Sequence, residues 1–490
     1  DSTEYAIAAY HFATAGQYSI KIDGQQLPPR YPPWFSVLLL APVYLITGGG
    51  IGTGIFAVTV MGILGILAAT YLGRQVAGAV GGILSATSVV SLSLYREYSA
   101  HIMTDVPCAA LIPVTCALFL HVRRSRSNRL NVYLLAGFLA AVCASLRPVS
   151  GAVILPFLYH TSQLRPFRST ITKTVCLLFP LFALSVASML YNLQVFGSPF
   201  RSGYNYWCAV PYDYPNLVFS IRYLSANSAA FLASGAPALI LVATVLFLLC
   251  KKRKNEERRV ALQAAGDIAL FGILSSGPII LFHSAYFFPD ARFFLPVLCI
   301  TAVLCGSLLA VVLPHISRSA LLVAEMLLLV IAIAVRCAMP EHLPIQRIAA
   351  DNICSYTPND ALIISSINPV YLEFMVGTGT NRKVIPFSRS VEYASKLLVS
   401  ERIAHPHPLP SHWSDHRCRG LIKSGAKEVI PFVATENMEA IAAAVRNGQS
   451  VYLNTSRMAA SDYDSALRLK NMFNLEQQSM HLYKLGPMYK

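Results

Sequence analysis

Long apolar runs separated by short polar segments make up most of the chain before position 340. Runs near 20 apolar residues are long enough to cross a bilayer as helices, and their number predicts about ten spanning helices. The runs are Ile51 to Leu72, Val76 to Leu94, Val106 to Val122, Val132 to Leu146, Val149 to Tyr159, Thr174 to Phe196, Ser228 to Cys250, Ala269 to Phe288, Phe293 to Leu313 and Ala320 to Met339. The run Trp34 to Ile46 is shorter and favours a helix lying in the membrane interface.

The polar segment at positions 1–36 precedes these runs. Its apolar residues recur at helical spacing, which predicts a helix that Gly16 ends. Asp1 and Glu4 lie one helical turn apart and would share one side of that helix. Prolines between positions 28 and 33 prevent another helix from starting before Trp34. The alternative reading of the two acids is a solvated first turn, where carboxylates suit the helix dipole.

After position 340 the composition becomes that of a soluble domain. Short strand-like runs alternate with helix-like ones, which predicts a small α/β domain at 341–490. The expected strands are Ala361 to Ser365, Lys383 to Phe387, Glu428 to Val433, Ser450 to Leu453 and Met480 to Leu485. The expected helices are Val391 to Arg402, Asn437 to Asn447 and Asp462 to Phe473. No glycine-rich phosphate loop follows any of these strands, so nucleotide binding is not supported.

Composition and charge agree with a membrane domain at 1–340, whose first extracytoplasmic loop is 1–50. Only 13% of the residues are charged and 55% are hydrophobic, whereas a soluble domain has about 25% charged residues. The net charge of +15 comes largely from short basic clusters between apolar runs, where they set membrane topology. We therefore exclude nucleic-acid binding. The 11 cysteines include no CxxC pair. Most of them are expected to be small buried apolar residues.

Basic loops fix the orientation of the predicted helices. The segments 123–129, 165–173 and 251–259 should be cytoplasmic. The first two share a side only if the chain between them crosses twice and turns near Arg147. Counting in both directions then places the first loop, the loops 95–105, 197–227 and 284–292, and the tail after Met339 on the extracytoplasmic side.

Many polar residues that a membrane protein rarely places without function fall on this outward face. They are Asp1, Glu4, Arg30, Arg96, Glu97, His101, Asp105, Arg147, Arg201, Tyr204, Asp290 and Arg292. Any one of them can be an interfacial side chain that reaches water. Carboxylates can also serve as bases or metal ligands, and arginines bind phosphate oxygens in bidentate geometry. Together they indicate a lipid-linked phosphate substrate at membrane level.

Several short motifs resemble those of a known superfamily. They are Asp1-x-x-Glu4, RYPPWF, MTDVP, LRP, FGSPFRSGY and PDARFF. In this order and on one side they resemble the GT-C membrane glycosyltransferases that use polyprenyl-phosphate sugars, such as the dolichyl-phosphate-mannose protein mannosyltransferases and the aminoarabinose transferases of lipid A. The resemblance implies a polytopic α-helical membrane protein with a C-terminal α/β domain. It also implies a spanning helix before the first loop, which we expect to precede Asp1.

The resemblance further implies a reaction and a location. A polyprenyl-phosphate sugar would be the donor, a lipid, protein or glycan the acceptor, and Asp1 the base of an inverting transfer. The catalytic candidates are Asp1, Glu4 and Asp105, and the substrate-binding candidates are Arg30, Arg96, Glu97, Arg147, Arg201, Tyr204 and Arg292. The enzyme would lie among the lipids of a bacterial inner membrane, with its site and C-terminal domain outside the cytoplasm.

Metal dependence is left open by one departure from the family pattern. Aminoarabinose transferases have a Glu-Lys-Pro-type motif where this chain has Arg30, Tyr31 and Pro32. No cofactor is certain, and a divalent metal would need Glu4, Glu97 or Asp105. The histidine-rich stretch 405–418 is a weaker zinc candidate, because such proline-broken loops are usually solvated.

Two rival functions use the same residues differently. In a secondary transporter or lipid flippase the charges would line a translocation path, but transporters favour midplane sites and internal repeats. A membrane-anchored sensor would bind its ligand through the tail and leave the first-loop carboxylates unexplained. The sequence Asn454-Thr455-Ser456 matches an N-glycosylation acceptor, a pattern that is common by chance.

Overall fold

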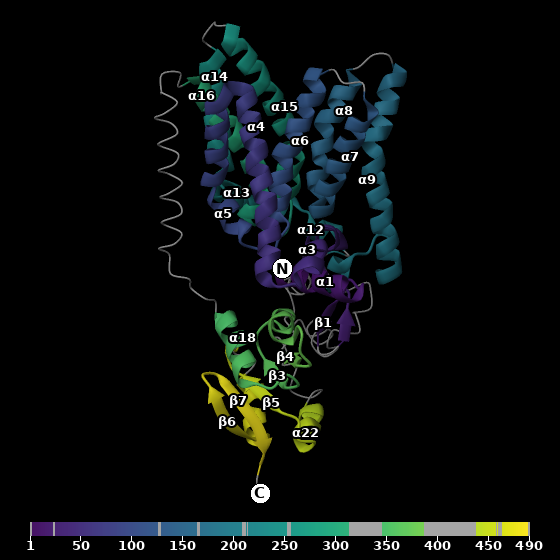
Figure 1. Ribbon diagram of the computed structural model, residues 1–490, viewed down its shortest axis with the longest axis vertical. Helices are drawn as coiled ribbons and strands as arrows, with labels where there is room; N and C mark the ends of the chain where they lie inside the picture. The colour runs from purple at the N-terminus through teal and green to yellow at the C-terminus, as the bar shows by residue number, and fades with distance from the viewer. Residues whose placement is uncertain are drawn as a thin grey trace.

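The computed structural model describes residues 2–22, 25–125, 129–163, 167–207, 212, 214–251, 256–312, 345–386, 438–456, 458 and 463–488. A bundle of long helices adjoins a smaller α/β unit (Figure 1). Several predictions fall outside the described residues: Asp1, the span Ala320 to Met339, the helix Val391 to Arg402, the strand Glu428 to Val433 and the histidine-rich stretch 405–418.

The predicted polytopic helical fold is confirmed. The main bundle helices are α4 (Ile51–Ser91), α6 (Asp105–Ser125), α7 (Leu130–Leu146), α8 (Leu155–Ser162), α9 (Phe167–Phe196), α13 (Leu224–Ala233), α14 (Ala236–Lys251), α15 (Glu256–Ser284) and α16 (Leu295–Val312). Among the described residues, five helices are long and apolar enough to span a membrane, or six if the pair α13 and α14, bent by 60°, counts as one span. Within the described residues, the predicted runs Val132 to Leu146 and Val149 to Tyr159 form shorter helical segments.

Helix α4 contains the predicted run Ile51 to Leu72 and most of the run Val76 to Leu94, with a sharp turn at the start of the second run. Ala77 and Gly78 have non-helical backbone angles, and Gly78 has a φ of +63°. The chain turns back there and brings the two arms so close that a Cβ atom on Gly73 would lie 2.1 Å from the carbonyl oxygen of Gly81. Glycine at position 73 therefore permits the two arms to pack closely, as small residues do between membrane helices.

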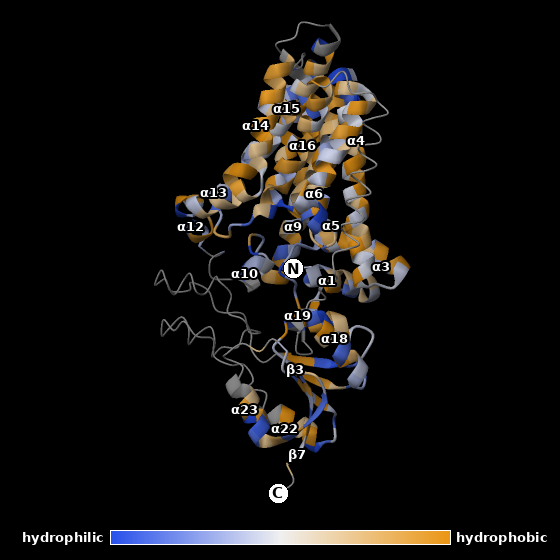
Figure 2. Ribbon diagram, turned by 90° about the vertical axis from the view of Figure 1, so that its left-hand side faces the viewer, coloured by the Kyte–Doolittle hydropathy of each residue, from blue (hydrophilic) through white to orange (hydrophobic). Residues whose placement is uncertain are grey.

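Helix α16 occupies the centre of the bundle, where it packs against α4, α6, α14 and α15. Ser85 donates a hydrogen bond to the carbonyl oxygen of Val303 at 3.0 Å, which joins α4 to α16. Helix α9, by contrast, exposes apolar side chains such as Phe179, Phe182 and Leu190. Apolar residues predominate along the bundle helices in Figure 2, as membrane-spanning helices require.

The first polar segment forms a small substructure at one end of the bundle (Figure 1). It comprises α1 (Ser2–Ala15), β1 (Ile20–Ile22), β2 (Gln25–Leu27) and a continuous helical stretch of α2 (Pro33–Phe35), η1 (Ser36–Leu40) and α3 (Ala41–Thr47). As predicted, α1 ends at Gly16, whose φ of +67° suits glycine. The stretch from Pro33 to Thr47 is a short apolar helix, and its exposed Leu45 and Ile46 suit an interfacial position.

The α/β unit contains the predicted strands that lie within the described residues. Its elements are α18 (Ile345–Tyr356), β3 (Leu362–Ser365), α19 (Pro369–Leu372), η5 (Glu373–Gly377), β4 (Lys383–Pro386), α22 (Met438–Arg446), β5 (Val451–Asn454), α23 (Tyr463–Met472), β6 (Phe473–Ser479) and β7 (Leu482–Pro487). The sheet has the order β4-β3-β5-β7-β6. Strands β4, β3 and β5 are parallel, whereas β7 is antiparallel to both β5 and β6.

The α/β unit contacts the bundle through the first polar segment. Lys21 Nζ on β1 lies 3.5 Å from Glu373 Oε1 on η5. Phe374 is buried in the same apolar core as α1 and the bundle helices. The two parts therefore meet at the end of the bundle that carries α1 (Figure 1).

Candidate functional site

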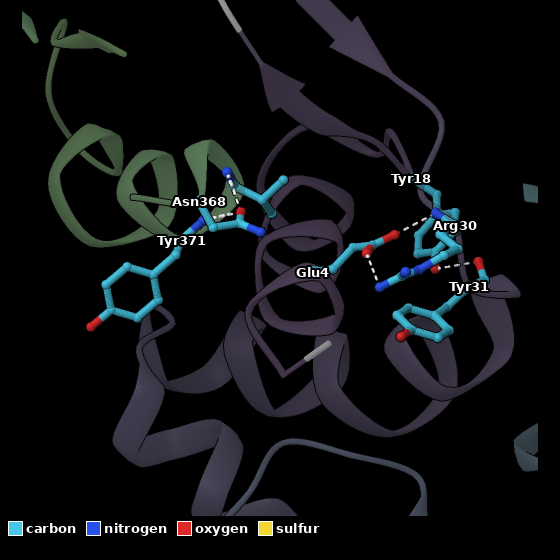
Figure 3. Close-up of polar contacts among 7 residues, drawn as sticks. Glu4, Tyr18, Arg30, Tyr31, Asn368 and Tyr371 are labelled. Carbon is cyan, nitrogen blue, oxygen red and sulfur yellow. Dashed lines mark hydrogen bonds and ion pairs between the residues drawn. The ribbon is translucent and has the colours of Figure 1, made fainter. Parts of the chain in front are cut away.

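Glu4 on α1 holds the segment that leads into α2. Its carboxylate accepts a hydrogen bond from the backbone N–H of Arg30, and its Oε2 lies 3.4 Å from Arg30 Nη2. Figure 3 shows Glu4 directed toward Arg30 and Tyr31. The Tyr18 hydroxyl donates to the Tyr31 carbonyl oxygen at 3.0 Å, which fixes the same turn. Glu4 thus has a positioning contact that local sequence spacing does not reveal.

Asp105 and Arg147 form a second pair deeper in the bundle. Asp105 is the first residue of α6 and is 1% exposed, whereas Arg147 follows α7 in an extended conformation. Arg147 Nη2 donates to Asp105 Oδ1. Within the described part of the chain, Asp105 Oδ2 and Arg147 Nη1 are buried without hydrogen-bond partners. One strong acceptor and one strong donor therefore remain for a bound molecule or water.

Arg292 forms a third pair next to the second. Its Nε lies 3.0 Å from Asp290 Oδ2, and its backbone N–H donates to Asp290 Oδ1 at 3.0 Å. The guanidinium carbons of Arg147 and Arg292 lie 5.1 and 5.5 Å from the ring centre of Phe293. Both arginines therefore lie beside one aromatic ring.

Tyrosines join the first polar segment to these pairs. Tyr31 stacks on Tyr5 with ring centres 4.3 Å apart, and its ring centre lies 5.7 Å from that of Tyr204 on α10 (Gly203–Trp207). Burial raises the pKa of Tyr5, Tyr31 and Tyr204. Glu4, Arg30 and Arg147 all lie close enough to Tyr204 to affect its pKa. These phenols are therefore neutral and lie close to the charged residues of the site.

The structure brings together six of the residues predicted for the site, namely Glu4, Arg30, Asp105, Arg147, Tyr204 and Arg292. Arg96 and Glu97 are exposed on α5 (Ser93–Ser99), and Arg201 is half-buried between α9 and α10. Asp1 lies outside the described residues. The sequence reading did not assign Tyr31 and Phe293 to the site. Tyr31 lies in the motif RYPPWF and Phe293 in the motif PDARFF, so membership of these motifs could have identified them.

The suggested metal ligands do not form a metal site in the described part of the chain, where no three histidine, cysteine or acidic side chains are grouped to hold an ion. Glu4 and Asp105 each face an arginine instead. A cation there would have to displace a guanidinium group. The glycosylation pattern at Asn454 is also poorly placed, because that side chain is completely buried.

Comparison with known proteins identifies the fold. No protein-family model and no curated protein sequence matches the chain. Among solved structures, ArnT from Cupriavidus metallidurans bound to undecaprenyl phosphate has 13% identity and a TM-score of 0.54, and the match covers 99% of this chain and 93% of ArnT. The apo state of ArnT gives a TM-score of 0.53. Archaeal oligosaccharyltransferase AglB from Archaeoglobus fulgidus, in complex with an inhibitory peptide and a dolichol-phosphate, has 12% identity and a TM-score of 0.40, with 92% of this chain and 65% of AglB covered. The chain therefore has the same overall fold as ArnT, in line with the fold that the resemblance of its motifs predicts.

Proposed function

We propose that this chain transfers a sugar from a polyprenyl-phosphate donor to an acceptor at the membrane. The observation that carries the proposal is the fold similarity to ArnT, which extends over 99% of the chain to a protein bound to undecaprenyl phosphate. Fold alone does not define chemistry. The grouped arginines and buried tyrosines supply the independent support.

The arginines suit the departing lipid phosphate. Arg147 and Arg292 lie over the same Phe293 ring, and Arg147 Nη1 has no hydrogen-bond partner within the described residues. A guanidinium group binds phosphate oxygens with two parallel hydrogen bonds. Negative charge grows on the phosphate as its bond to the sugar breaks, and donors already in place stabilise that charge.

Asp1 is the proposed general base. Its carboxylate would take the proton of an acceptor hydroxyl while the oxygen attacks the anomeric carbon and polyprenyl phosphate leaves, so that the configuration inverts. Asp105 is less suited to this role because its carboxylate is already engaged by Arg147. Glu4 is likewise engaged by Arg30 and serves as a positioning residue.

The outward orientation of the site belongs to the same proposal. Helix α6 begins at the buried Asp105 and ends with Arg123 and Arg124 in its last turn. Cationic residues favour the cytoplasmic side. Asp105, Arg147 and the α/β unit would then lie on the extracytoplasmic side of a bacterial inner membrane.

An assay with purified full chain and radiolabelled polyprenyl-phosphate sugars tests this function. We expect transfer by the native chain and a loss of about 100-fold or more in Asp1→Asn, since positioned bases contribute about 10² to 10⁴. Donor binding should persist in that variant, because the arginines remain. Asp351→Asn, which neutralises an exposed carboxylate on α18, is the matched control. Sugar movement across vesicles without transfer would favour the transporter alternative.

A further inference from the structure

The sheet of the α/β unit has a topological switch point between β3 and β5. The chain leaves β3 toward β4 on one side, whereas it leaves β5 toward β7 and β6 on the other. The two strands are parallel, with Ser365 paired with Asn454, so both carboxyl ends lie at the same edge of the sheet. Open α/β sheets bind ligands at such positions, because the diverging loops leave a crevice between them.

Unpartnered polar atoms are concentrated at this edge. Within the described part of the α/β unit, the buried side-chain atoms without hydrogen-bond partners are Ser366 Oγ, Asn454 Nδ2 and Ser479 Oγ. Ser366 follows β3, Asn454 ends β5, and Ser479 pairs with Leu482, which itself pairs with Asn454. All three groups therefore lie along one edge of the sheet. Buried polar groups are normally hydrogen-bonded, so each one needs an explanation.

Asn454 is the most deeply buried of the three residues. Its side chain is fully buried, and its Oδ1 accepts a hydrogen bond from Ser456 N at 3.0 Å and lies 3.5 Å from Ser365 Oγ. These contacts fix the orientation of the amide. Its Nδ2 donors are left without partners within the described residues. A fixed amide with unused donors at a switch point is suited to donate hydrogen bonds to a ligand.

The chemistry of the edge selects a neutral, hydroxyl-rich ligand. Residues 365–368, 454–456 and 479–482 offer hydroxyl, amide and imidazole groups and contain no lysine or arginine. Arg457 follows in the sequence but lies outside the described residues. Hydroxyl and amide groups can both donate to and accept from sugar hydroxyls. The absence of a glycine-rich loop argues against a nucleotide phosphate.

We propose that the sheet edge at the carboxyl ends of β3 and β5 binds a neutral saccharide that forms part of the acceptor. This rests on the proposed function and specifies its acceptor class. Helix α19, which follows β3, packs against α1 and β1 of the first polar segment. A saccharide held at this edge would therefore be retained on the side of the bundle that carries Glu4 and Arg30.

The test measures saccharide binding by saturation-transfer NMR on the full chain in a detergent without sugar groups. The probes are chitotriose, maltotriose and mannotriose, with inorganic phosphate as the charged comparison. We expect at least one trisaccharide to bind, with affinity lowered about tenfold in Asn454→Asp, which keeps Oδ1 but removes the donors. Ser366→Ala should weaken binding while leaving the fold intact, because it removes a hydroxyl that has no partner. Ser450→Ala, before the opposite end of β5, should bind normally.

Two results would overturn the site: binding of no trisaccharide by the native chain, or equal binding in native chain, Ser366→Ala and Asn454→Asp when thermal unfolding shows all three folded. Binding of phosphate alone would also overturn it. A different result would contradict the proposed function. A chain that binds a trisaccharide at this edge but transfers no labelled sugar would keep the saccharide site and lose the glycosyltransferase assignment.

Discussion

Arg147 and Asp105 come from the end of α7 and the start of α6 and meet in a buried ion pair, in which the carboxylate side chain is 1% exposed. The pair fixes one oxygen of Asp105 and one terminal nitrogen of Arg147, and leaves the other of each unpartnered within the described residues. It thus holds an arginine in place and keeps one of its donors available. That combination suits binding of an anion in a low-dielectric site.

Arg147→Ala should cost about 3–5 kcal/mol of unfolding free energy, because it leaves the buried Asp105 without its partner. Arg147→Lys keeps the charge but loses the planar fork, so donor affinity should fall while the protein still folds. Chemical denaturation in detergent and donor-binding titration measure the two effects. Normal donor affinity and turnover in Arg147→Lys, with only a loss of stability, would reduce Arg147 to a structural residue at the turn before Pro148.

Glu4→Ala should lower the unfolding free energy by about 1–3 kcal/mol, since it leaves the Arg30 backbone N–H without its charged acceptor. Glu4→Gln should cost less, because an amide oxygen can still accept that hydrogen bond. If Glu4 only positions the turn, Glu4→Gln should also retain more transfer activity than Asp1→Asn. Equal losses of activity in the two variants would show that the charge of Glu4 takes part in the reaction.

The bundle helices were predictable from the sequence because each one contains its own run of apolar residues. The turn in α4, at Ala77 and Gly78, lies at the start of the second predicted run and not between the two runs, whereas Gly16 ended α1 as expected. Strand β6 was missed because its sequence, FNLEQQS, is polar and lies at the edge of the sheet, where burial imposes little pattern.

The site was predictable in its residue types but not in its pairings. The loops predicted to face outward supplied Arg30, Arg147 and Arg292 as candidates, yet no local spacing links Arg147 to Asp105 across 42 positions. The role of Phe293 also depends on tertiary packing, because its sequence position looks like any apolar residue at the start of a span. Pairing across helices is a property of the fold, which sequence periodicity does not contain.

Acidification should loosen the first polar segment through His11. Burial lowers the pKa of His11, whose Nδ1 lies 2.8 Å from the Ser19 carbonyl oxygen and must donate to it. The neutral ring is favoured in the folded state, so this stabilisation is present above about pH 6.5 and is lost as the pH falls below it. Hydrogen exchange of residues 2–22 at two pH values, corrected for intrinsic rates, measures the effect. His11→Asn should reduce the pH dependence, whereas His101→Asn, at an exposed histidine, should not.

Membrane topology is expected to place the first segment and the α/β unit on the same, non-cytoplasmic side. Thr14 and Asp351 are exposed and suit cysteine labelling in a background in which the exposed Cys354, together with Cys208, Cys337 and Cys418, is replaced by serine. An impermeant maleimide should label Thr14→Cys and Asp351→Cys from the same side. Asn131→Cys, at the start of α7, should be labelled only from the other side. Labelling of positions 14 and 351 from opposite sides would contradict the proposed orientation.

The contact between Lys21 and Glu373 should determine how firmly the α/β unit docks. Glu373 is 5% exposed in its side chain and Lys21 is 36% exposed, so the pair is only partly screened by water. Glu373→Lys places two positive charges together at a buried contact and should increase hydrogen exchange in both α1 and α19. The double variant Lys21→Glu with Glu373→Lys restores opposite charges and should recover part of the protection. Arg347→Glu, which reverses an exposed charge on α18, serves as the control. Recovery of hydrogen-exchange protection in the double variant would identify the ion pair as a docking contact. Equal protection in all variants would show that the apolar contacts of Phe374, and not the ion pair, hold the α/β unit in place.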